Sequence, residues 1–124
     1  MKISRVWTVS FSPTGTSKKT IDAIASSISG GEQASLDLTY PLAADEQSFG
    51  ADELVVIGVP VYAGRVAPLA VQRLEKIQGN TTPAVLVVLY GNRDYEDALI
   101  ELRDIARAAS FVPVAASAFV GEHS

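Results

Sequence analysis

The sequence predicts a single α/β domain built on an open parallel β-sheet with helices on both faces. Two observations lead to this prediction. Apolar and β-branched runs recur along the 124 residues, and segments with helical periodicity stand between them. Alternation with short connections is typical of right-handed crossovers and a parallel sheet. The length suits one domain, residues 1–124, with a core that needs no disulfides.

Five strands are expected in chain order. Residues 54–59 and 84–89 are uninterrupted apolar runs, which indicates strands covered on both faces. Residues 34–38 alternate between apolar and polar side chains, as in an edge strand with one solvated face. The other two strands are expected at residues 6–11, which end at a Ser-Pro pair, and at residues 112–119.

Three helices are expected between these strands. Residues 16–29 carry apolar side chains at helical spacing, namely Ile21, Ile24, Ala25 and Ile28. A second helix begins at Pro68, ends before Gly79 and has an apolar stripe of Leu69, Ala70, Leu74 and Ile77. A third opens at Asp94 or Tyr95 and runs to Ala109. For residues 41–50, which are weakly patterned, only a loop or one helical turn is predicted.

The composition excludes several classes of function. Cysteine is absent, which removes disulfides, thiolate metal sites and cysteine nucleophiles. The single histidine, His123, is next to the last residue, so neither a histidine triad nor a multi-histidine zinc site is expected. The net charge of −4 argues against nucleic-acid binding. No apolar run reaches the roughly 18 residues of a membrane span, and no secretory leader is evident, so a cytoplasmic protein is expected.

The loop after the first strand is rich in hydroxyl groups. Residues 12–17 include four of them, on Ser12, Thr14, Thr16 and Ser17, and lead through Gly15 into a helix. Free N–H groups at a helix start favour an anion, and hydroxyls donate further hydrogen bonds to phosphate oxygens. The alternative is an ordinary helix cap, which needs one hydroxyl rather than four. Neither a Walker loop nor a dinucleotide fingerprint occurs in the sequence.

Two later loops place a tyrosine close to a glycine at strand ends. Tyr62 and Gly64 lie in residues 60–65, and Gly91 and Tyr95 in residues 90–95. Aromatic faces suit stacking on a planar heterocycle, whose polar edge needs backbone donors and acceptors. The alternative for each tyrosine is strand-end packing with a solvated hydroxyl.

Taken in order, these three loops resemble the flavodoxin family. The first resembles the [ST]-x-T-G-x-[ST] phosphate loop, and the other two resemble the loops that border the flavin ring. The amino-acid sequences of residues 11–16 and 121–124 are most similar to those of flavodoxin domains fused to a bacterial-type ferredoxin domain in anaerobes. The resemblance implies a three-layer fold with sheet order 2-1-3-4-5 and FMN as cofactor. The implied cofactor-binding residues are Ser12, Thr14, Gly15, Thr16 and Ser17 for the phosphate, and Pro60, Tyr62, Ala63, Gly64, Arg65, Gly91, Asn92, Arg93, Asp94 and Tyr95 for the ring.

An electron-transfer domain that cycles between flavin redox states is the function this resemblance implies. Its partner would be a ferredoxin-type domain or a reductase. Neither nucleic acid nor a membrane is an expected partner. A small NAD(P)H-dependent flavin or quinone reductase is an alternative, as is a flavin-free interaction module on the same fold. No side chain is expected to act as acid, base or nucleophile, because the flavin supplies the chemistry.

The chain departs from the family in two places. The cysteine-rich ferredoxin segments are absent, so no iron–sulfur cluster is expected. The C-terminal helix after the strand at residues 112–119 is also absent, which predicts a domain truncated after its fifth strand. We expect a bare strip on the strands at residues 54–59, 84–89 and 112–119, and a homodimer through it. The competing outcome is that residues 112–124 rearrange to cover the strip.

Overall fold

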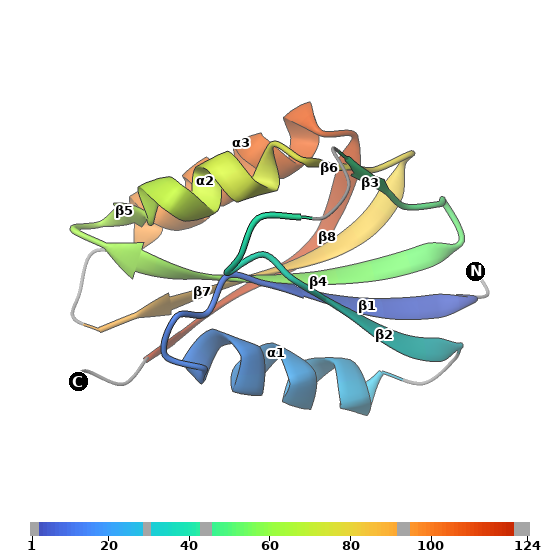
Figure 1. Cartoon of the computed structure of the whole chain (residues 1–124), viewed down its shortest axis with the longest axis horizontal. Coiled ribbons are helices and arrows are strands. Elements are labelled where there is room, and N and C mark those ends of the chain that lie inside the picture. The colour runs from blue at the N-terminus through green and yellow to red at the C-terminus, as the bar shows by residue number, and fades with distance from the viewer. Residues whose placement is uncertain (1–2, 29–30, 43–45, 92–94, 121–124) are drawn as a thin grey trace.

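The computed structural model describes residues 3–28, 31–42, 46–91 and 95–120. Within them the main sheet has five parallel strands, in the predicted order (Figure 1). They run from one edge to the other as β2 (Glu32–Asp37), β1 (Arg5–Ser10), β4 (Glu53–Tyr62), β7 (Thr82–Tyr90) and β8 (Phe111–Val120). The order 2-1-3-4-5 is therefore confirmed, and each strand lies where the apolar runs placed it.

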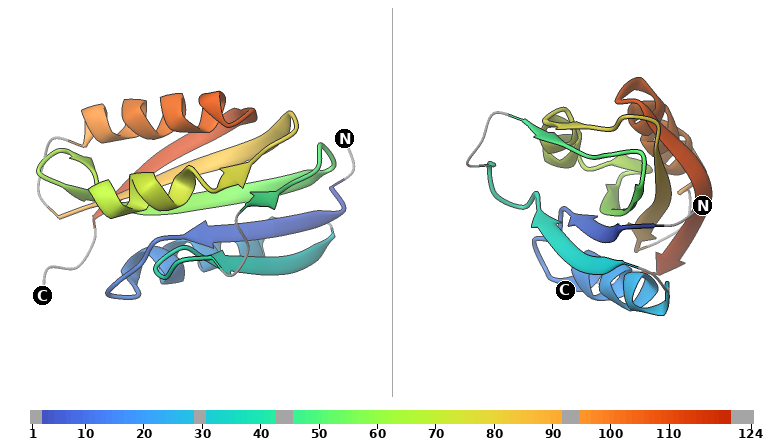
Figure 2. Two further views of the ribbon diagram at one scale, coloured as in Figure 1. Left: turned by 45° about the horizontal axis from the view of Figure 1, so that its top comes forward. Right: turned by 90° about the vertical axis from the view of Figure 1, so that its right-hand side faces the viewer.

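The helices form two layers around this sheet. Helix α1 (Thr16–Ser27) covers one face, and α2 (Pro68–Leu74) and α3 (Glu96–Ala108) cover the other (Figures 1 and 2). All three predicted helices are present, but α2 is shorter than expected. It ends at Leu74, and Ile77 lies instead in β6 (Ile77–Gln78), which pairs with β3 (Gln47–Ser48). Leu69, expected in the apolar stripe, is 43% exposed.

The segment before β4 covers part of the sheet without forming a helix. Phe49 is almost fully buried, and its ring meets the edge of Trp7 at a centroid distance of 5.2 Å. Trp7 also donates a hydrogen bond from Nε1 to Glu53 at 2.7 Å. Trp7 therefore packs on the sheet beneath Phe49, an aromatic side chain from a segment that is not helical.

The face under α1 is closed over the two central strands. Gly58 of β4 leaves room for Ile21 of α1, because a Cβ atom at position 58 would collide with the Ile21 side chain. Val56 and Val87 are fully buried on this face, and Leu89 is 4% exposed. The expectation of a bare strip over residues 54–59 and 84–89 is therefore wrong, because α1 packs across both strands.

Exposed apolar side chains concentrate on β8 instead. Phe119 pairs in register with Leu89 and Val112 with Pro83, so both face the α1 side, and they are 40% and 42% exposed. Residues 112–120 form a strand as expected, rather than a rearranged cover, and residues 121–124 lie outside the described part. Self-association through β8 stays a prediction, which light scattering on the chain tests.

Candidate cofactor-binding site

The predicted binding loops gather at one end of the sheet. Strands β1, β4 and β7 are parallel neighbours, so their carboxyl ends open onto the same edge, at the left of Figure 1. Ligands of open α/β sheets bind beyond this edge. The β1–α1 loop (residues 12–15), the end of β4 and the end of β7 all meet there.

The β1–α1 loop turns into the helix at Gly15. This residue is the N-cap of α1 and has a φ of 86°, in the left-handed region that favours glycine. A Cβ atom at position 15 would have no neighbour within 4 Å. The space above the turn is open, so a ligand can approach the backbone closely.

Three backbone N–H groups of this turn have no protein acceptor. In the described part of the chain, the amides of Thr14, Thr16 and Ser17 donate no hydrogen bond. The N-cap residue Gly15 has no side chain to cap them, and the Ser12 hydroxyl oxygen accepts only the next amide, that of Lys18. Free amides at a helix N-terminus carry the positive end of the helix dipole and bind anions. The loop therefore has the one capping hydroxyl that the alternative of an ordinary helix cap requires, and among the described residues it leaves three further amides without an acceptor.

Ser12 anchors the loop to its surroundings. Its amide donates to Thr39 Oγ1 at 2.8 Å, its carbonyl accepts from the Gly15 amide at 3.1 Å, and its hydroxyl oxygen accepts from the Lys18 amide at 3.1 Å. The hydroxyls of Thr14 and Thr16 lie 3.3 Å apart. Ser17 is buried at the first turn of α1. All five predicted phosphate residues thus belong to one compact turn.

The nearest lysine does not add a free charge to this turn. Lys18 Nζ pairs with Asp22 at 2.7 Å across one turn of α1. Residues 12–17 contain neither lysine nor arginine, so this stretch itself presents amides and hydroxyls rather than an ammonium group. Such a neutral donor set fits a phosphate held by backbone and hydroxyl donors.

Residues 60–65, expected as a loop, form a β-hairpin. Strand β4 continues to Tyr62, and β5 (Arg65–Val66) returns antiparallel to it, with Tyr62 opposite Arg65. The two turn residues, Ala63 and Gly64, have φ angles of 53° and 80°. Two positive φ values match the type I′ turn, whose twist suits a two-residue hairpin. The loop expectation is wrong because the hairpin extends β4 by three residues beyond Val59.

Glu101 of α3 holds this hairpin in place. Its Oε1 accepts from Arg65 Nε at 3.0 Å and from the Val66 amide at 2.9 Å. This hydrogen bond from Arg65 to the Glu101 carboxylate raises the pKa of Arg65 above its ordinary value. Arg65 is thus turned toward α3. Pro60 accepts from the Ala67 amide at 3.2 Å, and Tyr62 is 51% exposed at the hairpin tip.

The β7–α3 connection brings two tyrosines together. Tyr90 and Tyr95 stack at a centroid distance of 4.5 Å with 24° between their planes. Tyr95 also packs against the core as the N-cap of α3. Gly91 follows Tyr90 and is half-buried. The predicted residues Asn92, Arg93 and Asp94 lie outside the described residues.

Sequence reasoning missed the contribution of the β2 end. Thr39 supports Ser12, and the neighbouring Tyr40 is 69% exposed beside it. The binding residues predicted from the sequence lie only in the loops after the first, third and fourth strands. The signal that could have drawn attention to this end is the polar run after the edge strand, which places a carboxylate, a hydroxyl and a phenol within four residues.

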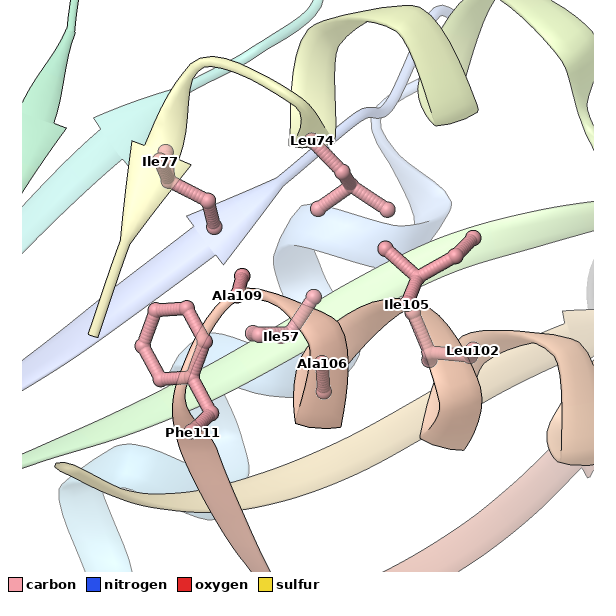
Figure 3. A pocket seen from close by; sticks show the side chains of 8 residues that line it. All are labelled: Ile57, Leu74, Ile77, Leu102, Ile105, Ala106, Ala109 and Phe111. Carbon is pink, nitrogen blue, oxygen red and sulfur yellow. The ribbon is translucent and has the colours of Figure 1, made fainter. Parts of the chain in front are cut away.

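Two hollows away from this edge do not suit the predicted cofactor. One is an apolar cavity of about 10 Å³ between α2, α3 and the sheet, which has room for about one water molecule (Figure 3). A larger groove of about 550 Å³ runs between α3 and β8. Leu99, Ile100 and Val114 line it, and it holds none of the predicted phosphate residues.

The described part of the chain shows neither a membrane-spanning helix nor a cluster of metal-ligating side chains. None of its helices has the length and hydropathy needed to cross a membrane. Histidine, aspartate and glutamate side chains do not gather in groups of three or more within residues 3–28, 31–42, 46–91 and 95–120, so no metal centre is indicated there.

Comparison with solved structures agrees with this fold. A protein from Bacteroides uniformis, named provisionally as a flavoprotein, superposes with a TM-score of 0.66 at 14% identity, over 96% of this chain and 93% of its own. The apo form of an NADH:FMN oxidoreductase, EMOB, superposes with a TM-score of 0.62 at 14% identity, over 94% of this chain and 74% of its own. No protein-family model matches the sequence. No curated protein matches it either. The chain therefore has a flavodoxin-like fold.

Proposed function

We propose that this chain is an FMN-binding redox domain whose β1–α1 loop holds the flavin phosphate. The observation that carries the proposal is the set of three unpaired amides, on Thr14, Thr16 and Ser17, around an open left-handed glycine. The same three residues also carry hydroxyls, and those of Thr14 and Thr16 lie 3.3 Å apart. The names of the two structural neighbours, a flavoprotein and an NADH:FMN oxidoreductase, support the same cofactor.

The remaining predicted residues would enclose the ring. The hairpin tip with Tyr62, Ala63 and Gly64 stands on one side of the loop, and the Tyr90–Tyr95 pair stands beyond it in strand order. Bound FMN would supply the one- and two-electron chemistry, and the protein would set its orientation and its exposure to solvent. The chain's own side chains are proposed to bind and position rather than to react.

Electron transfer to a partner protein is the proposed role of the loaded domain. A ferredoxin-type domain or a reductase would exchange electrons with it. The second candidate, an NAD(P)H-dependent reductase, is favoured by one observation, the likeness to the NADH:FMN oxidoreductase fold.

One experiment tests the cofactor and separates the two roles. The purified chain is titrated with FMN while flavin fluorescence is followed, and saturation at one FMN per chain is expected. The loaded protein is then mixed with NADH or NADPH, and an electron carrier leaves the nicotinamide absorbance unchanged over minutes. Rapid, catalytic loss of that absorbance would favour the reductase, and the absence of any FMN binding would favour the flavin-free module.

A further inference from the structure

We infer that Thr39 is a positioning residue that fixes the β1–α1 loop for phosphate, and this inference rests on the proposed function. Thr39 lies after the edge strand β2, outside the loop itself. Its Oγ1 accepts the Ser12 amide at 2.8 Å, and this hydrogen bond joins residues 27 apart in sequence. The contact links the end of β2 to the first residue of the loop.

Asp37 fixes the orientation of Thr39 in turn. Its Oδ1 accepts the Thr39 amide at 2.8 Å, which is the short-range turn that aspartate forms with the residue two positions later. Leu38, between the two, is fully buried, and its amide donates to the Ser10 carbonyl. Backbone and side chain therefore both tie this short segment to the end of β1.

As a consequence, the amide, the carbonyl and the hydroxyl oxygen of Ser12 each take part in a hydrogen bond within the protein. Thr39, Gly15 and Lys18 occupy its amide, its carbonyl and its hydroxyl oxygen, respectively. Ser12 can still donate its hydroxyl proton to a ligand, but its amide cannot turn toward one without breaking the Thr39 contact. Ser12 and Thr39 together brace the loop while the amides of Thr14, Thr16 and Ser17 stay free.

A brace of this kind should favour ligands that carry the phosphate. Without it, the loop gains freedom that the phosphate must remove on binding, and the Ser12 amide needs another acceptor. A ligand that lacks the phosphate does not depend on the loop in this way. Thr39 should therefore change the ratio of FMN to riboflavin affinity, whereas a residue with only a structural role would change both affinities together.

Paired variants of Thr39 test the inference. Thr39→Val removes the acceptor at nearly constant shape, and Thr39→Ser retains it. Fluorescence titration should show FMN bound roughly tenfold more weakly by Thr39→Val, with riboflavin affinity unchanged, and FMN affinity restored in Thr39→Ser. Amide hydrogen exchange at Ser12 in the ligand-free chains should accelerate in Thr39→Val alone.

The outcomes separate this inference from the proposed function. An unchanged FMN to riboflavin ratio in Thr39→Val, with FMN still bound, would overturn the inference and leave the proposed function standing. Equal weakening of both ligands would also overturn it, because that result indicates a general structural role. No FMN binding by the wild-type chain would overturn the proposed function itself, and the positioning role with it. Should Thr39→Val fold poorly, Asp37→Ala loosens the same contact and Asp37→Asn retains the accepting oxygen.

Discussion

The β1–α1 loop and the β4–β5 hairpin lie at the same edge of the sheet, yet they differ in how many of their polar groups have hydrogen-bond partners. The loop leaves three amides without an acceptor among the residues that the structure describes. The hairpin pairs its strands and gives the Val66 amide and the Arg65 guanidinium to Glu101. One region is thus ready to bind an anion, and the other is internally satisfied. This difference supports the proposal that the first region would recognise a phosphate and the second would position the ring.

Two glycines with similar backbones make the comparison testable. Gly15 and Gly64 have φ angles of 86° and 80°. Gly15→Val disfavours the left-handed backbone by about 1–2 kcal/mol, so the free loop should leave this conformation and phosphate binding would have to restore it. With the loss of one or two phosphate hydrogen bonds at about 1 kcal/mol each, FMN affinity should fall by about 100-fold. Riboflavin affinity should change little, as measured by fluorescence titration.

Gly64→Val is the matched control for that variant. It introduces the same backbone strain into the hairpin, so it should lower the melting temperature without changing the FMN to riboflavin ratio. If Gly64→Val changed that ratio as much as Gly15→Val, the assignment of phosphate recognition to the β1–α1 loop would fail.

Thr14→Ala should have the next largest effect on phosphate recognition. The variant removes one exposed hydroxyl and leaves the three amides in place. The loss of one hydrogen bond to a charged group, at about 1.5 kcal/mol, predicts roughly tenfold weaker FMN binding. Isothermal titration calorimetry with FMN and riboflavin measures it, and an equal loss for both ligands would contradict the assignment.

Removing Glu101 tests the hairpin rather than the loop. Glu101→Ala leaves the Val66 amide without its acceptor, at a cost of about 1 kcal/mol, which lowers the melting temperature by roughly 5 °C. Glu101→Gln keeps an accepting oxygen and should retain most of that stability. Calorimetry measures both variants, and an unchanged melting temperature in Glu101→Ala would show that the hairpin does not depend on α3.

Of these variants, Arg65→Glu should have the smallest effect, and the effect should be on the reduction potential of bound FMN. The family resemblance implies that Arg65 borders the ring, where its positive charge would favour reduced flavin, whereas the structure pairs Arg65 with Glu101. Arg65→Glu should then lower the second reduction potential of bound FMN slightly, since the partner carboxylate already offsets the positive charge. A potentiometric titration measures the potential, and a rise would contradict the predicted sign.

The strands and helices could be predicted because their patterns are long. Residues 54–59 and 84–89 are continuous apolar runs, and α1 repeats its apolar positions over three turns. Short features escaped prediction for the opposite reason. The two-residue strands β3 and β6 have no periodicity, and the positive φ of Ala63 is not a feature that an alanine suggests.

The site was predicted in part for a similar reason. The hydroxyl-rich loop is local, so its residues are adjacent in sequence and their number is visible there. The contacts of Thr39 with Ser12 and of Glu101 with Arg65 span 27 and 36 residues, and a single hydroxyl or carboxylate shows no pattern. The cover over Val87 likewise depends on how Ile21 fits against Gly58, which only three-dimensional packing reveals.

The most direct test of the central claim compares FMN with riboflavin on the wild-type chain. The two ligands share the ring and differ by the phosphate, so their affinity ratio reports on the β1–α1 loop alone. Because the free amides of Thr14, Thr16 and Ser17 would each bind the phosphate, we predict FMN to bind at least about tenfold more tightly in fluorescence titrations. Equal affinities for the two ligands would contradict the account.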